Sequence, residues 1–186
     1  MESSTPAAHR RGWLAWVATI LVAVFPFRSR AGGFLPESTG LRFGIAPTAE
    51  NFDFHQGEAF ADWNLPWRCD LGAKMTLQTR LDASAGWFGR GAEGAGIFGA
   101  GPFLALGRTG LPLQLEAGAN VTGITRTQFV GKNFGDPVQF TSYAGLYWDF
   151  LPHFRVGCRF QHMSNASLNQ HNPGINLIMA GVSYVF

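Results

Sequence analysis

The sequence predicts an all-β protein: an eight-stranded antiparallel transmembrane β-barrel over residues 32–186, preceded by an N-terminal signal peptide over residues 1–31. Three observations support this fold class. Eight segments have the character of strands, and most of them alternate apolar and polar residues, as strands do when their two faces meet different environments. Aromatic residues gather near the ends of these segments, and the polar faces carry charges of both signs.

Length and composition narrow the function classes. The chain has 186 residues, which suits one domain, and its net charge is only +2 with the basic residues scattered, so no nucleic-acid partner is predicted. Cys69 and Cys158 fall in predicted strands that are distant in the chain, and we expect free thiols because strand pairing would have to bring them together first. No residues have the spacing of a metal site, and no cofactor is predicted.

The first 31 residues are organised like a secretory signal. Arg10 and Arg11 form a basic segment, and Trp13–Phe25 is an apolar run shorter than a membrane-spanning helix. Small residues precede Gly32, so we expect cleavage between Ala31 and Gly32 and export of the remaining chain. An uncleaved N-terminal anchor is the alternative interpretation.

The strand predictions follow from the alternation and from the residues that interrupt it. The clearest segment is 113–122, in which every second residue is apolar. Residues 54–64 leave open which face is apolar, and residues 95–106 are apolar on both faces. Leu65-Pro66-Trp67 is predicted as a tight turn because proline cannot continue a central strand. The predicted strands are 41–46, 54–64, 68–87, 95–106, 113–122, 139–150, 154–164 and 174–186.

Two architectures could use such strands. A soluble sandwich turns its apolar faces inward, whereas a membrane barrel turns them toward lipid. The even number of strands, their length, the alternately short and longer connections and the terminal Phe186 in an amphipathic strand favour the barrel. A barrel of eight strands has a lumen filled by side chains, so we expect function in the loops or on the outer wall rather than in a pore.

Polar residues interrupt the apolar face of the last two predicted strands. His162 and Ser164 share the apolar parity of residues 154–164, and Asn176 shares that of residues 174–186. Because both termini of an even-stranded barrel lie on the periplasmic side, these residues are expected to face outward at the external rim. A histidine beside a serine can activate the hydroxyl as a nucleophile, which at this depth would meet lipid esters. The alternative is a merely hydrated strand end, because H-x-S alone is a weak pattern.

The same region resembles a known family. His162-Met163-Ser164-Asn165-Ala166, followed by Asn172-Pro173-Gly174-Ile175, is similar to the lipid A 3-O-deacylase family of outer-membrane barrels, as is the stretch Glu58–Trp67. The resemblance covers about residues 41–186. It implies an eight-stranded barrel that removes the 3-position acyl chain of lipid A with a Ser-His-Glu triad on its outer wall. It also implies roles for individual residues: Ser164 as nucleophile, His162 as general base, and Asn172, Asn165 and Ala166 as the oxyanion and substrate-binding set.

One departure concerns the third member of the triad. Asn176 stands where the family has a glutamate, and an amide oxygen can orient the histidine ring but cannot supply a negative charge. Apart from this position, the resemblance implies an esterase of the bacterial outer membrane that acts on lipid A or lipopolysaccharide of the outer leaflet. A non-catalytic barrel of the same family, with a structural, lipid-binding or adhesive role, is the alternative. The membrane is an expected partner, a homodimer through the lipid-facing wall stays open, and a soluble exported sandwich is the third interpretation.

Overall fold

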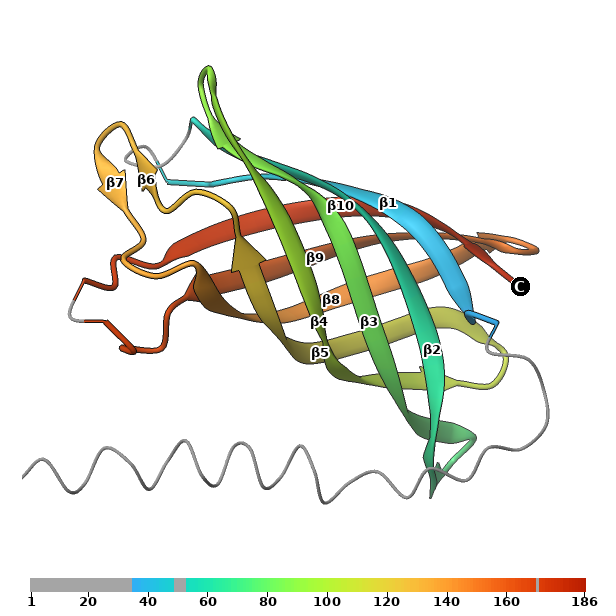
Figure 1. The fold of residues 1–186 in the computed structure, drawn as a ribbon. Helices are drawn as coiled ribbons and strands as arrows, with labels where there is room; N and C mark the ends of the chain where they lie inside the picture. The colour runs from blue at the N-terminus through green and yellow to red at the C-terminus, as the bar shows by residue number, and fades with distance from the viewer. Residues whose placement is uncertain (1–34, 49–52, 170) are drawn as a thin grey trace, which may run out of the picture. The chain divides into compact units, whose positions relative to one another are not determined.

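The computed structural model describes residues 35–48, 53–169 and 171–186; the predicted signal peptide and its cleavage site lie outside the described residues. Eight strands form a closed antiparallel barrel in which neighbours in the chain are neighbours in the wall (Figure 1), which confirms the predicted fold class. The barrel strands are β1 (Ser38–Ile45), β2 (Phe54–Gly72), β3 (Met75–Arg90), β4 (Glu93–Arg108), β5 (Leu111–Ile124), β8 (Val138–Leu151), β9 (Phe154–Ser164) and β10 (Ile175–Val185). No helix long and apolar enough to span a membrane occurs in the described ranges.

The two ends of the barrel differ in their connections. At one end, called the turn end here, short turns at residues 73–74, 109–110 and 152–153 join the strands. At the other, the loop end, the longest connection runs between β5 and β8. This connection, residues 125–137, is called the cover loop and contains a small hairpin of β6 (Gln128–Phe129) and β7 (Lys132–Asn133). The C-terminus lies at the opposite end from this hairpin (Figure 1).

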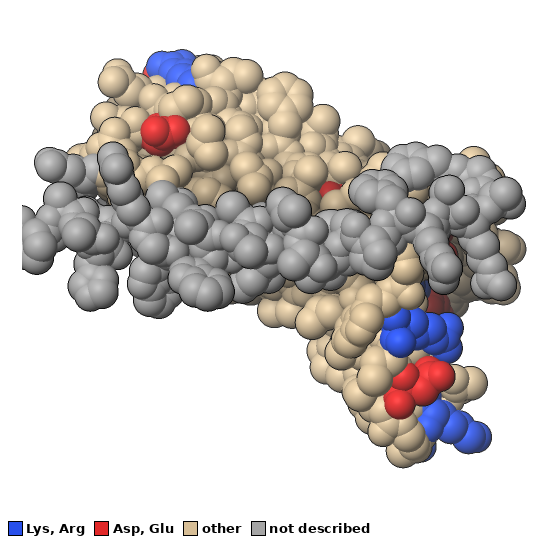
Figure 2. All heavy atoms as spheres, turned by 60° about the horizontal axis from the view of Figure 1, so that its bottom comes forward, with Lys and Arg blue, Asp and Glu red and all other residues tan. Residues whose placement is uncertain are grey.

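The outer wall is apolar, as the alternation predicted. Successive residues of a strand point to opposite faces of the wall, and the outward-pointing residues are mostly apolar. Examples that are exposed on the outer wall are Phe43, Leu104, Leu115 and Phe160. Figure 2 shows few charged side chains on the uncovered part of the wall. The inverted pattern, with apolar residues outside and charges inside, is typical of a barrel that stands in lipid.

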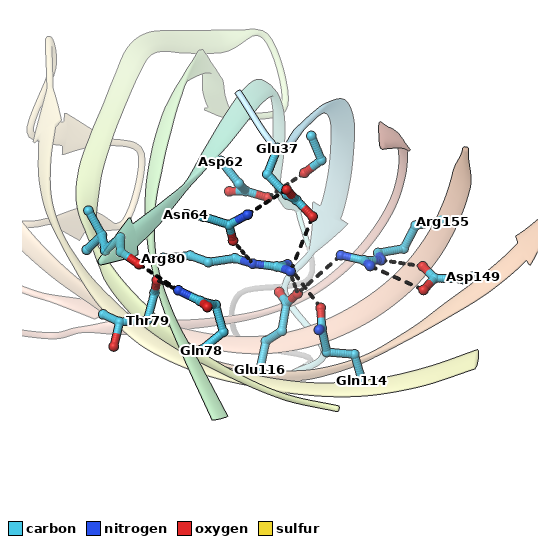
Figure 3. A network of polar contacts seen from close by, with 12 residues as sticks. Glu37, Asp62, Asn64, Gln78, Thr79, Arg80, Gln114, Glu116, Asp149 and Arg155 are labelled. Carbon is cyan, nitrogen blue, oxygen red and sulfur yellow. Dashed lines mark hydrogen bonds and ion pairs between the residues drawn. The ribbon is translucent and has the colours of Figure 1, made fainter. Parts of the chain in front are cut away.

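Charged and polar side chains fill the middle of the lumen and its turn end. In Figure 3, Arg80 lies among polar side chains and donates to Asn64 at 2.9 Å and to Gln114 at 3.1 Å. Deeper in the lumen, one carboxylate oxygen of Glu58 accepts hydrogen bonds from Arg42 at 2.8 Å and from Arg159 at 2.9 Å. Pairing of opposite charges makes their burial tolerable, and the packed interior agrees with the expectation that this barrel is not a pore.

Aromatic side chains fill the loop end of the lumen. Phe54 and Phe88, from β2 and β3, stack with ring centroids 5.3 Å apart. Phe129 and Phe134, from the cover loop, meet them edge to face with centroids 5.5 to 5.8 Å apart. All four rings are buried. These four rings form an aromatic plug that closes the barrel from within and anchors the cover loop, and no pattern in the sequence predicted it.

One predicted turn is wrong. Leu65-Pro66-Trp67 lies inside β2, which continues to Gly72, so the following strand begins at Met75 and not at Arg68. The register of β2 against β3 shifts between Asn64 and Arg68, and this irregularity accommodates the proline. The pairing of β2 with β1 ends at Asp62, so beyond it β2 is an edge strand, where a missing N–H is tolerated.

Two further expectations are settled by the structure. The ambiguous faces of β2 are resolved: Phe54, Gln56 and Glu58 point into the lumen and are buried. Cys69 and Cys158 are both free thiols, as predicted.

Candidate active site on the outer wall

Three neighbouring strands bring polar side chains to one level of the outer wall at the loop end. In the strand register, His162 of β9 pairs with Asn176 of β10 on one side and with Ser142 of β8 on the other. His162 and Ser142 are exposed and Asn176 is half-buried. All three therefore have the outward orientation that parity predicted for His162 and Asn176. The next residue of this parity on β9 is Ser164, which is half-buried at the strand end.

A hydrogen bond orients the histidine ring. His162 Nδ1 lies 2.7 Å from Asn176 Oδ1. Because a carbonyl oxygen can only accept, Nδ1 is the donor of this hydrogen bond. In a neutral imidazole this bond leaves the lone pair on Nε2, which is the tautomer that a general base requires.

Gly174 leaves the space in which the ring lies. It has φ +56°, and a Cβ built on it would lie 3.0 Å from His162 Cε1 and 3.5 Å from Nε2. Such a contact is tighter than a carbon–carbon contact at its optimum, so a larger residue would press on the ring edge that carries the basic nitrogen. The positive φ is also unfavourable for residues other than glycine.

The loop that follows Ser164 joins the predicted oxyanion residues. The backbone N–H of Asn165 donates to Asn172 Oδ1 at 3.0 Å, which leaves the Asn172 amide group as a donor. The Asn165 side chain is fully buried and donates to the carbonyl oxygens of Phe134 and His171, so it is turned away from the outer wall. Ala166 has φ +50°, a left-handed conformation that is rare for a residue with a Cβ and concentrates at functional sites.

Two features of this site were missed from the sequence. Ser142 has the outward parity of Phe140 and Ala144 on the same strand, so alternation alone could have placed it beside His162. The contact of Asn165 with the cover loop joins residues that are 31 positions apart, and no local pattern indicates it. Within the described residues, no group of three or more histidine, cysteine or acidic side chains could hold a metal ion.

The sequence and the fold of this chain are similar to those of known proteins. A family model described as lipid A 3-O-deacylase (PagL) matches residues 54–185. The lipid A deacylase PagL of Bordetella bronchiseptica is 30% identical over 115 residues, which are 61% of this chain and 64% of that relative, so the match spans a little under two thirds of the relative's length. The crystal structure of the outer membrane enzyme PagL has a TM-score of 0.69 and 21% identity, and the match covers 80% of this chain and 99% of the other. That likeness shows a shared fold.

Proposed function

Because the chain belongs to the lipid A 3-O-deacylase (PagL) family, we propose that it is an outer-membrane esterase that hydrolyses the 3-O-linked acyl chain of lipid A. The observation that carries the proposal is the hydrogen bond between His162 and Asn176, which orients a base on the outward face of β9 beside Ser164. Polar groups on a lipid-facing wall are unfavourable unless they pair or serve a function. In a barrel whose termini lie on the periplasmic side, the loop end is the external end, where the esters of an outer-leaflet lipid would meet these residues.

The proposed mechanism is acyl transfer through serine. His162 Nε2 takes the proton from the Ser164 hydroxyl as the serine oxygen attacks the ester carbonyl. The negative charge that develops on the carbonyl oxygen is stabilised by amide donors of the following loop, and the Asn172 side chain is the proposed donor among them. His162 then protonates the departing sugar oxygen. Water, activated by the same base, cleaves the acyl-serine and releases the fatty acid.

Asn176 makes this a weaker triad than one with a carboxylate. Its oxygen holds the ring in the correct tautomer, but it provides no negative charge to stabilise the imidazolium that forms. A carboxylate-to-amide change in a serine triad can lower kcat by about 10⁴-fold, and that loss includes a wrong tautomer. Since Nδ1 faces an acceptor here, we expect a slow enzyme whose deficit is smaller than this.

The direct test is to express the chain in the outer membrane of a Gram-negative bacterium that lacks such an activity and to analyse its lipid A by mass spectrometry. We expect a species that has lost one 3-hydroxyacyl chain. Ser164→Ala should abolish it, while the heat-modifiable gel mobility of the folded barrel stays the same. Unchanged lipid A in cells that contain the folded wild-type barrel would contradict the proposal.

A non-catalytic barrel of the same family is the second candidate, and the amide at position 176 is the observation that favours it. Asn176→Glu separates the two. If wild type is a slow enzyme, we expect the carboxylate to raise kcat by about 10-fold or more, within the roughly 10⁴-fold range of such changes. If both wild type and Asn176→Glu are folded and inactive, the non-catalytic role is the correct one.

A further inference from the structure

The cover loop is fastened to the rest of the barrel on the side away from the candidate active site. Glu93, the first residue of β4, forms an ion pair with Arg126 and accepts the backbone N–H of Val130 at 2.6 Å. Arg90 donates to the carbonyl oxygen of Val130 at 2.5 Å. Together with Phe129 and Phe134, the two phenylalanines of the aromatic plug that come from the cover loop, these contacts hold the loop across the end of the lumen.

The opposite side of the cover loop contacts the loop that follows Ser164. The Asn165 side-chain amide donates to Phe134 O at 3.1 Å and to His171 O at 2.8 Å, so it joins the two loops. Asn165 is completely buried, so its amide nitrogen depends on these two carbonyls in place of water, while its Oδ1 accepts the backbone N–H of Ser167 at 3.0 Å. Asn169 adds an exposed hydrogen bond of 3.3 Å to Gly135 O.

Gly135 allows the two loops to approach this closely. A Cβ built on Gly135 would lie 2.3 Å from His171 O and 3.1 Å from Asn165 Nδ2. The first distance is a clash with backbone, which a side-chain rotation cannot relieve. Position 135 must therefore be a glycine if the cover loop is to stay packed against the loop that contains Asn165 and His171.

We infer that the cover loop positions the loop that follows Ser164, which carries the proposed oxyanion donor Asn172, and that it acts through Asn165. Phe134 is fixed by the aromatic plug, its carbonyl fixes the Asn165 side chain, and the Asn165 N–H in turn holds Asn172 Oδ1 at 3.0 Å. This chain of contacts runs from the lumen to the outer wall and sets the direction of the Asn172 amide group. Its catalytic consequence rests on the function proposed above. Phe134, Gly135 and the Asn165 side chain are positioning residues, since they act on the substrate only through Asn172 and the backbone beside Ser164.

A matched pair of glycines tests this inference. Gly135 and Gly131 both lie in the cover loop, with φ +79° and +74°, so alanine imposes a similar backbone strain at both. A Cβ on Gly131 would meet only the end of the Arg90 side chain, at 3.1 Å. We expect Gly135→Ala to lower kcat for lipid A deacylation by about 10- to 100-fold with KM within about threefold, because a displacement of about 1 Å at such a site costs up to about 100-fold. Gly131→Ala should stay within about twofold of wild type.

A second readout follows the loop itself and does not depend on activity. In hydrogen–deuterium exchange of the purified barrels, Gly135→Ala should exchange faster than wild type between Ser164 and Asn172, and Gly131→Ala should not. If Gly135→Ala does not fold, as judged by heat-modifiable mobility, Asn165→Asp replaces it. That change keeps the size of the side chain and turns a donor into an acceptor opposite two carbonyl oxygens.

The outcomes separate this inference from the function on which it rests. Equal kcat values and equal exchange in the two glycine variants would overturn the positioning role. An inactive wild type would overturn the proposed function. The exchange comparison would then decide the coupling alone: faster exchange confined to Gly135→Ala supports it, and no difference overturns it.

Discussion

The two faces of β9 carry polar residues for different reasons. On the inner face, Arg159 and Gln161 are buried and hydrogen-bonded to one another at 2.8 Å, and each also reaches a partner on β2. On the outer face, His162 is exposed and bonds to Asn176, in a wall that is otherwise apolar. Inside, these polar groups bond to one another across the lumen and join β9 to β2. Outside, His162 and Asn176 pair with each other beside Ser164, and the function proposed above gives these polar groups a catalytic role.

The energetics of the two faces differ in the same sense. Breaking a buried ion pair by removing one partner is costly, because the other charge remains buried without compensation. Removing an exposed side chain from a strand end changes stability little. Inner-face substitutions should therefore reduce stability and outer-face substitutions should reduce activity, and the following variants test that division.

The largest effect is expected from adjacent residues on opposite faces of β9. His162→Ala removes the base and should lower kcat by at least about 10³-fold, as loss of a triad member does, with little change in stability. Gln161→Ala should instead lower the free energy of unfolding by about 1–3 kcal/mol, because the Gln56 and Arg159 groups that it contacts lose a buried partner. Turnover per folded molecule in Gln161→Ala should match wild type. Deacylation rates and urea unfolding of the same refolded samples provide the measurement, and a large loss of kcat in Gln161→Ala would contradict the division.

A second test concerns ion pairs within and outside the lumen. Glu58 pairs with Arg159 at 2.9 Å, with side chains only 4% and 3% exposed, and it also holds Arg42. We expect Glu58→Ala to lower the free energy of unfolding by about 3–5 kcal/mol, because two buried guanidinium groups lose their shared acceptor. Asp70→Ala is the control. The Asp70 side chain is 75% exposed and its partner Arg68, at 3.6 Å, is 62% exposed, so this ion pair should contribute less than about 1 kcal/mol to the free energy of unfolding. Similar unfolding midpoints for the two variants would show that the lumen network contributes little to stability.

The distinction between the faces also explains how much could be predicted from the sequence. The barrel and the outward orientation of His162 and Asn176 rest on a period of two, which is local and survives errors in strand bounds. The turn predicted at Pro66 was wrong. A strand can contain a proline where its N–H has no partner, and β2 lacks a partner on one side there because β1 does not extend past Asp62, which only the paired sheet reveals. The aromatic plug and the buried Asn165 side chain were missed because both arise where a long loop folds back onto residues distant in the chain. Asn172 was assigned by resemblance, and its contact with the Asn165 N–H could be read only from coordinates.

The smallest effect is expected at Gly174, where the backbone meets the outer-face histidine. Alanine there would place a Cβ 3.0 Å from Cε1 of His162, so the ring that is hydrogen-bonded to Asn176 would have to move by a few tenths of an ångström. We expect Gly174→Ala to lower kcat by about 10-fold, within the range expected for misplacement of a catalytic group by less than 1 Å. Gly110→Ala is the control, because it has φ +85° with nothing within 4 Å of a built Cβ, so it bears the backbone strain without touching the site. Steady-state kinetics on lipid A measure both variants. A loss of kcat equal in the two would assign the effect to backbone strain and separate Gly174 from the orientation of the base.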